Sequence, residues 1–119
     1  MLLILLLIIL DQITKYFFGN IHNYGAAFSI LQGYTIFLIS FSFIALIICV
    51  YYFLKEKDKK IKFALMFLIS GITGNLIDRV YFGYVRDFID LKIWPVFNLA
   101  DSFNVIGVFL IIYFSFKKK

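Results

Sequence analysis

Two aspartates stand where a membrane helix would not ordinarily carry a charge. Asp78 follows Lys62 by 16 residues, and Asp101 precedes Lys117 by 16 residues. If both lysines mark the same membrane face, a rise of about 1.5 Å per residue puts each carboxylate ~24 Å along its helix. The hydrocarbon core is about 30 Å thick, so both groups would lie just inside its far side. Ionisable side chains at such depth usually face a bundle interior or a wet cavity and carry function.

Other polar side chains are expected near the same membrane face. Asp11 and Lys15 are one helical turn apart and can form an ion pair. Asn75 shares a helix face with Asp78 and Arg79, whereas Asp78 and Arg79 are adjacent and do not face one another. The whole set of candidates at this face comprises Asp11, Lys15, Asn23, Asn75, Asp78, Arg79, Asp87, Asn98 and Asp101.

Asp87 lies in a segment, residues 84–91, whose alternation predicts a strand. On a period of two, Asp87 shares a face with Val85, Ile89 and Leu91, and is the lone charge on that apolar face. A carboxylate in such a place either finds a partner or has its pKa raised by desolvation.

Plainer structural interpretations exist for several of these residues. Asp11 and Lys15 fit a structural ion pair, and Asp101 followed by Ser102 fits a helix cap. His22 is the only histidine and Cys49 the only cysteine, so the chain lacks the ligands of a zinc site and the base of a serine-type nucleophile. The chemistry that remains is that of carboxylates, without a metal or a cofactor.

Composition defines the elements that must position these groups. The 119 residues are 63% hydrophobic, which is typical of an integral membrane protein and is here interpreted as one domain, residues 1–119. Eight of the twelve basic residues lie in two clusters, residues 55–62 and 117–119. The positive-inside rule explains that placement, which argues against nucleic-acid binding despite the net charge of +5.

The apolar stretches predict an all-α membrane protein, a four-transmembrane-helix bundle with both termini cytoplasmic. The helices are expected at about residues 1–18, 36–54, 61–79 and 100–116. A small extracytoplasmic β-rich segment would lie between the last two. A cleaved signal peptide is the rival interpretation of residues 1–10, but no basic segment precedes them and no small-residue cleavage site follows.

Five segments then occur in an order that resembles a known family: 11–15 (DQITK), 23–28 (NYGAAF), 71–79 (GITGNLIDR), 85–88 (VRDF) and 97–101 (FNLAD). They are similar to the lipoprotein signal peptidase (signal peptidase II) family of bacterial membrane aspartyl proteases, over nearly the whole chain. The resemblance implies that Asp87 and Asp101 form the catalytic dyad, and moves Asp78 to a supporting role. The residues implied to bind substrate or support the dyad are Asp11, Lys15, Asn23, Gly25, Asn75, Asp78, Arg79, Asn98 and Ala100.

The resemblance also implies an activity and a location. The enzyme would cleave prolipoproteins on the amino side of a lipobox cysteine that carries diacylglyceryl. It would act as a monomer among the lipids of the bacterial cytoplasmic membrane, with the active site near the outer face. Two close carboxylates share one proton near neutral pH, and which aspartate holds it is left open. Asn104, one turn after Asp101, departs from the family by placing an amide where an apolar residue is expected.

Two other functions use the same residues. A proton- or ion-conducting protein would need polar residues through the full depth of a helix, and residues 36–54 offer only Ser40, Ser42 and Cys49. A non-enzymatic assembly factor would keep its function when the buried aspartates are replaced by asparagine.

Overall fold

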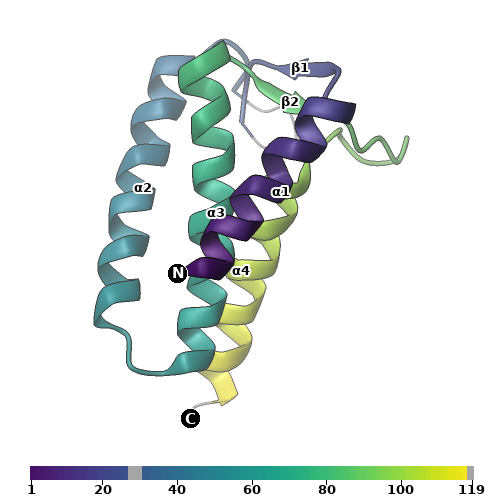
Figure 1. The fold of residues 1–119 in the computed structure, drawn as a ribbon. Helices are drawn as coiled ribbons and strands as arrows, with labels where there is room; N and C mark the ends of the chain where they lie inside the picture. The colour runs from purple at the N-terminus through teal and green to yellow at the C-terminus, as the bar shows by residue number, and fades with distance from the viewer. Residues whose placement is uncertain (27–30, 118–119) are drawn as a thin grey trace.

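The computed structural model describes residues 1–26 and 31–117. Within these residues the chain forms a helical bundle with a two-stranded sheet at one end (Figure 1). The helices are α1 (Leu2–Phe18), α2 (Thr35–Lys55), α3 (Lys59–Phe82) and α4 (Leu99–Lys117), and the strands are β1 (Ile21–Asn23) and β2 (Val85–Asp87).

Three of the described helices, α2, α3 and α4, are long and apolar enough to cross a membrane. Helix α1 has 17 residues, and Figure 1 shows it beginning part-way along the bundle. Much of the apolar surface faces outward: Ile36 at the start of α2 is 81% exposed, as suits a helix solvated by lipid. The prediction of a mostly helical membrane protein is confirmed, and a fourth span stays a prediction.

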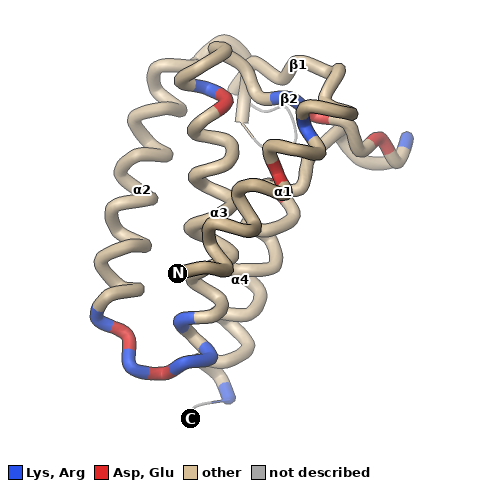
Figure 2. Tube along the Cα trace, viewed as in Figure 1, with Lys and Arg blue, Asp and Glu red and all other residues tan. Residues whose placement is uncertain are grey.

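Charged residues gather at the two ends of the bundle (Figure 2). One end carries the basic connection between α2 and α3 together with Lys117 at the end of α4. Lys118 and Lys119, which belong to the expected basic tail, lie outside the described residues. The opposite end carries the sheet, the aspartates of α1, α3 and α4, and the arginines of α3 and β2.

Helix α3 lies at the centre of the bundle and packs against each of the other helices. Small residues permit this close approach: a Cβ on Gly74 would overlap the Asp11 carboxylate of α1, and would lie 3.2 Å from the Ala100 Cβ of α4. Ser70 is fully buried on the same helix, where its hydroxyl donates to the Met66 carbonyl at 2.6 Å. Ser70 and Gly74 thus form a small-residue surface on α3 at which neighbouring helices come close.

The sheet joins two distant segments. β1 and β2 pair antiparallel, with Ile21 opposite Asp87 and Asn23 opposite Val85. Gly83, at a φ of 83°, ends α3 in the left-handed conformation and turns the chain into β2.

The strand expected over residues 84–91 is shorter in the structure, and the placement of Leu91 on its buried face is wrong. Val85 and Asp87 are buried, but Leu91 is 57% exposed. The chain turns at Lys92, whose φ is 69°, and the Asp90 side chain accepts the Lys92 backbone N–H at 3.0 Å. This local turn directs the chain away from the sheet and back towards α4.

Candidate active site

Asp87 and Asp101 reach the same polar cluster from different elements. Asp87 ends β2 and is fully buried; Asp101 lies in the first turn of α4 and is 5% exposed. Asn98 contacts both: its side-chain Nδ2 donates to Asp87 Oδ1 at 2.8 Å, and its backbone N–H donates to Asp101 Oδ2 at 3.2 Å. One buried residue therefore joins two carboxylates that stand 14 positions apart in the sequence.

The start of α4 orients Asp101. The Asn98 side-chain Oδ1 accepts the Asp101 backbone N–H at 2.9 Å, while the Asp101 carboxylate accepts the Asn98 N–H in return. This reciprocal pattern is a capping box, which satisfies two backbone donors at the start of the helix. The helix-cap interpretation of Asp101 and its candidacy for chemistry are thus compatible, because the cap holds the carboxylate in one orientation.

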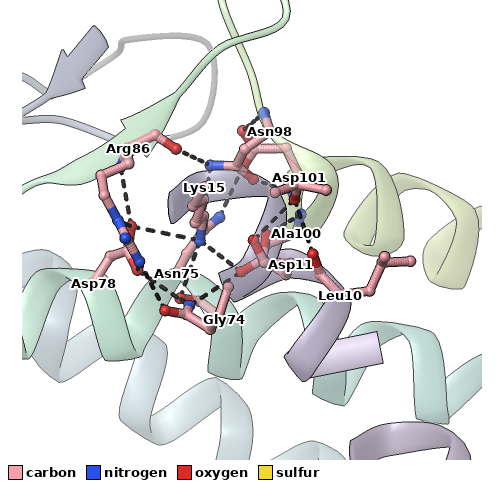
Figure 3. Close-up of polar contacts among 12 residues, drawn as sticks. Leu10, Asp11, Lys15, Gly74, Asn75, Asp78, Arg86, Asn98, Ala100 and Asp101 are labelled. Carbon is pink, nitrogen blue, oxygen red and sulfur yellow. Dashed lines mark hydrogen bonds and ion pairs between the residues drawn. The ribbon is translucent and has the colours of Figure 1, made fainter. Parts of the chain in front are cut away.

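Asn75 of α3 also forms a hydrogen bond with Asp101. Its Nδ2 donates to Asp101 Oδ1 at 2.9 Å, and its Oδ1 accepts from Asn98 Nδ2 and Lys15 Nζ, each at 3.1 Å (Figure 3). Both oxygens of Asp101 therefore have a hydrogen-bond donor, and the donors are themselves fixed by further bonds.

The surroundings of Asp87 favour its protonated form. Burial first, and then the charge of Asp101, raise the pKa of Asp87 to about 7, while the amides of Asn98 and Asn23 act in the opposite direction. Asp87 Oδ2 is buried and has no hydrogen-bond partner among the described residues. A carboxyl of this kind can hold or release a proton in the neutral range, as general acid–base chemistry requires.

A second cluster of buried charges lies beside the first (Figure 3). Lys15 Nζ lies 2.7 Å from Asp11 Oδ2 and 3.6 Å from Asp78 Oδ2, and all three side chains are fully buried. Arg86 binds Asp78 through its backbone N–H, its Nε and its terminal nitrogen, at 3.0–3.1 Å. The pair of Asp11 and Lys15 predicted from their spacing is thus formed, and a second cation completes the cluster.

The second cluster also reaches α4. Asp11 Oδ1 accepts the Ala100 backbone N–H at 2.9 Å, at the end of α4 that carries Asp101. Ala100 has no exposed surface. The ion cluster therefore fixes α1 against both α3 and α4 at the level of the carboxylate pair.

The expected network of Asn75, Asp78 and Arg79 is only partly present. Asn75 and Asp78 both contact Lys15, but Arg79 points elsewhere, donating to the Gly25 carbonyl at 3.2 Å and to Ser42 Oγ at 3.5 Å. Adjacent helical residues face different directions, so Arg79 cannot follow Asp78 into the ion cluster.

Two members of the ion cluster were not predicted. Arg86 is the cation that pairs with Asp78, and Gln12 bridges them, donating to Asp78 Oδ1 at 3.2 Å and accepting from Arg86 at 2.7 Å. Two signals in the sequence pointed to them: each stands next to a candidate, Gln12 beside Asp11 and Arg86 beside Asp87, and each lies in a segment that carries the family resemblance.

The loop after β1 is held by Asn23. Its Oδ1 accepts the Gly25 N–H at 2.9 Å and Gln32 Nε2 at 2.8 Å, and its Nδ2 donates to the Ala26 carbonyl at 2.9 Å. Asn23 thereby positions the Gly25 carbonyl that Arg79 binds. Ala27 and Phe28, the last residues of the same sequence segment, lie outside the described residues.

Two pockets reach Asp101. The larger, of about 520 Å³, has Asn75, Arg79 and Asp101 among its polar lining residues, while its apolar lining comes from α2, from α3 and from the loop before α2. The smaller, of about 280 Å³, is bounded by Trp94, Phe97 and the outer face of α4. Asp101 therefore borders two pockets whose linings are mostly apolar. Within the described residues, no three His, Cys, Asp or Glu side chains are grouped to hold a metal ion.

Buried aspartates that open onto an apolar pocket, in a bundle of lipid-facing helices, are the features of a membrane aspartic peptidase. The family model described as signal peptidase (SPase) II matches residues 3–117, and the chain belongs to this family.

Individual relatives agree with this assignment. The chain is 36% identical over 132 aligned positions to the lipoprotein signal peptidase of Moorella thermoacetica, covering 93% of this chain and 88% of that protein. It is 40% identical to the lipoprotein signal peptidase of Staphylococcus aureus strain MRSA252, covering 88% and 80% of the two chains. Two solved bacterial membrane enzymes share the fold. One has a TM-score of 0.90 at 37% identity and covers 98% of this chain and 86% of its own; the other has 0.84 at 34%, with 99% and 92% covered.

Proposed function

We propose that Asp87 and Asp101 are the catalytic pair of this signal peptidase II, a membrane aspartic endopeptidase that removes signal peptides from prolipoproteins. One observation carries the proposal: Asn98 binds both carboxylates, and neither of them forms a salt bridge with any described residue. Two close carboxylates without a neutralising cation retain one proton between them at neutral pH.

The shared proton supports a specific sequence of steps. With a pKa of about 7, Asp87 carries the proton below neutrality and polarises the scissile carbonyl, while ionised Asp101 takes a proton from the attacking water. The water oxygen bonds to the carbonyl carbon and forms a tetrahedral intermediate. The C–N bond then breaks as the proton held by Asp101 passes to the leaving amine. Asp87 recovers its own proton as the new carboxyl group forms.

The remaining site residues act by holding this geometry. Asn98 and Asn75 orient the carboxylates, and the Asp11, Lys15, Asp78 cluster fixes α1 against the helices that carry them. Around the pocket, Arg79 lies where it can contact the substrate backbone, and it is fixed by the Gly25 carbonyl that Asn23 positions. The small side chain of Ala100 allows α3 and α4 to pack closely.

The substrate proposed is a prolipoprotein whose lipobox cysteine carries diacylglyceryl, cut on the amino side of that cysteine. The apolar walls of the pocket of about 520 Å³ support this choice, because acyl chains need such a surface beside the scissile bond. The enzyme acts as a monomer that is in contact with membrane lipids.

We place the whole chain, residues 1–119, in the bacterial cytoplasmic membrane as one domain. Four helices, with α1 as the first, would span the bilayer with both termini cytoplasmic. The basic connection between α2 and α3 supports this orientation, since it lies at the end of the bundle opposite the aspartate pair (Figure 2). The pair is then near the outer face.

Cleavage of a synthetic diacylglyceryl-modified prolipoprotein peptide by the purified protein tests the proposal. Asp87→Asn and Asp101→Asn are each expected to reduce kcat by about 10²-fold or more, because each removes a proton-transferring group. Asp90→Asn is the matched control, since Asp90 is an exposed aspartate three residues from Asp87. Retained turnover in either of the first two variants, with folding verified by thermal unfolding, would exclude that residue from the chemistry.

A further inference from the structure

Asn104 is a polar residue of the pocket that the catalytic steps do not use. It follows Asp101 by one turn of α4 and lines the same pocket of about 520 Å³. Its Oδ1 is buried and has no hydrogen-bond partner among the described residues, a condition it shares with Asp87 Oδ2. An amide so placed in a membrane helix is costly unless something binds it.

The packing of α3 determines which end of this amide is available. A Cβ on Gly71 would overlap Asn104 Oδ1, so the oxygen lies directly against the glycine backbone. The weakly polar Cα–H of Gly71 suits an oxygen better than an N–H group. The side-chain Nδ2 of Asn104 is then the free end, since it donates no hydrogen bond to a described residue.

The surroundings of this donor are apolar. Leu68 and Ile72 of α3 and Ala45 of α2 line the pocket with it. The donor therefore needs an acceptor that the ligand brings, and that acceptor must lie deeper than the scissile bond. Asn104 lies about 4.5 Å beyond Asp101 along the helix axis, towards the membrane interior.

We infer that Asn104 donates a hydrogen bond to an ester carbonyl of the diacylglyceryl group of the substrate, and so selects for ester-linked lipid. This inference rests on the proposed function. In a diacylglyceryl cysteine the ester carbonyls are attached to the cysteine side chain through the glyceryl group, and they lie between the scissile peptide bond and the acyl chains. They are hydrogen-bond acceptors without donors, which matches the free Nδ2 group of Asn104.

Two lipopeptides that differ only at these carbonyls test the inference. One carries the diacylglyceryl (diester) group and the other its dialkylglyceryl (diether) analogue, with the same peptide and chain lengths. The wild type is expected to favour the diester by about three- to tenfold in kcat/KM, mostly through KM, because a binding contact acts on both ground and transition states. Asn104→Leu and the smaller Asn104→Ala should each cleave the two lipopeptides equally well.

Ser115→Leu is the control, because it places leucine at an exposed polar site near the far end of the same helix. It should keep the wild-type preference. An unchanged diester preference in a cleaving Asn104 variant would overturn the inference and leave the proposed function intact. Failure of the wild type to cleave either lipopeptide would overturn the proposed function and the inference with it.

Discussion

The protein buries two pairs of aspartates side by side, and the pairs differ in their counter-charges. Asp11 and Asp78 are held by Lys15 and Arg86 at ion-pair distance. Asp87 and Asp101 receive hydrogen bonds from asparagine amides and backbone groups instead. Neutral donors orient a carboxylate without placing a counter-charge beside it, so the two pairs differ in whether a cation lies at ion-pair distance.

Under the proposed assignment, burial alone does not distinguish the reactive carboxylate from the supporting one. Asp78 and Asp101 are both buried near the same end of the bundle, and a depth argument selects them equally. What separates them is a cation at ion-pair distance: Asp78 has Lys15 at 3.6 Å and Arg86 at 3.0 Å, whereas Asp101 forms no salt bridge with a described residue. The cluster of Asp11 and Asp78 also holds the surroundings of Asp101 in place, since Asp11 accepts the Ala100 N–H and Lys15 donates to Asn75.

Removing Lys15, the cation that pairs with Asp11 and Asp78, is expected to have the largest effect on stability. Lys15→Met would leave Asp11 buried without its partner, and loss of one member of a buried pair costs about 3–5 kcal/mol. Thermal unfolding in detergent measures this as a clear fall in Tm. Adding Asp11→Asn to the variant should restore part of the loss.

Lys92→Met is the matched control, because the Lys92 side chain is 85% exposed in its contact with Asp90. An exposed pair contributes little, so its Tm should stay close to that of the wild type. Equal unfolding temperatures for Lys15→Met and Lys92→Met would show that the buried cluster does not depend on its cation.

Asp87 and Asp101, the pair without a salt bridge, are expected to make the stability of the fold depend on pH. Because the pKa of Asp87 is raised from 3.8 to about 7, the folded protein binds more protons than the unfolded chain between these values. Stability therefore falls as the pH rises through that window, by about 2–4 kcal/mol. Asp87→Asn removes this loss, so the variant should be more stable than the wild type at pH 8 and similar to it at pH 4.

Unfolding of both proteins across pH 4–8 is the measurement, with Asp90→Asn as the control. Parallel curves for the wild type and Asp87→Asn would contradict a raised pKa at this position.

Local patterns predicted much of the site. Helical spacing gave the pair of Asp11 and Lys15, and a period of two placed Asp87 on the same face as Val85, which is buried with it. The reciprocal cap of Asn98 and Asp101 also lies within one turn and is visible as a spacing of three. Such features depend on residues that are close in sequence, so their geometry follows from one element.

The contacts that were missed join distant segments. Adjacency on the helix excludes Arg79 as the partner of Asp78, but nothing local indicates that Arg86 is the partner, because that contact depends on how β2 folds back over α3. Pairing of residues 21–23 with β2 likewise depends on where α1 ends. The turn at Lys92 is a single left-handed residue that the strand alternation does not reveal.

Titration of the Asp87 carboxyl by carbon-13 NMR, in the wild type and in Asp101→Asn, tests the central claim most directly. We predict a pKa of about 7 for Asp87 in the wild type, and a lower pKa in the variant because the neighbouring negative charge is gone. A wild-type value near 4, or one that Asp101→Asn leaves unchanged, would contradict the view that these two aspartates form an uncompensated pair sharing one proton.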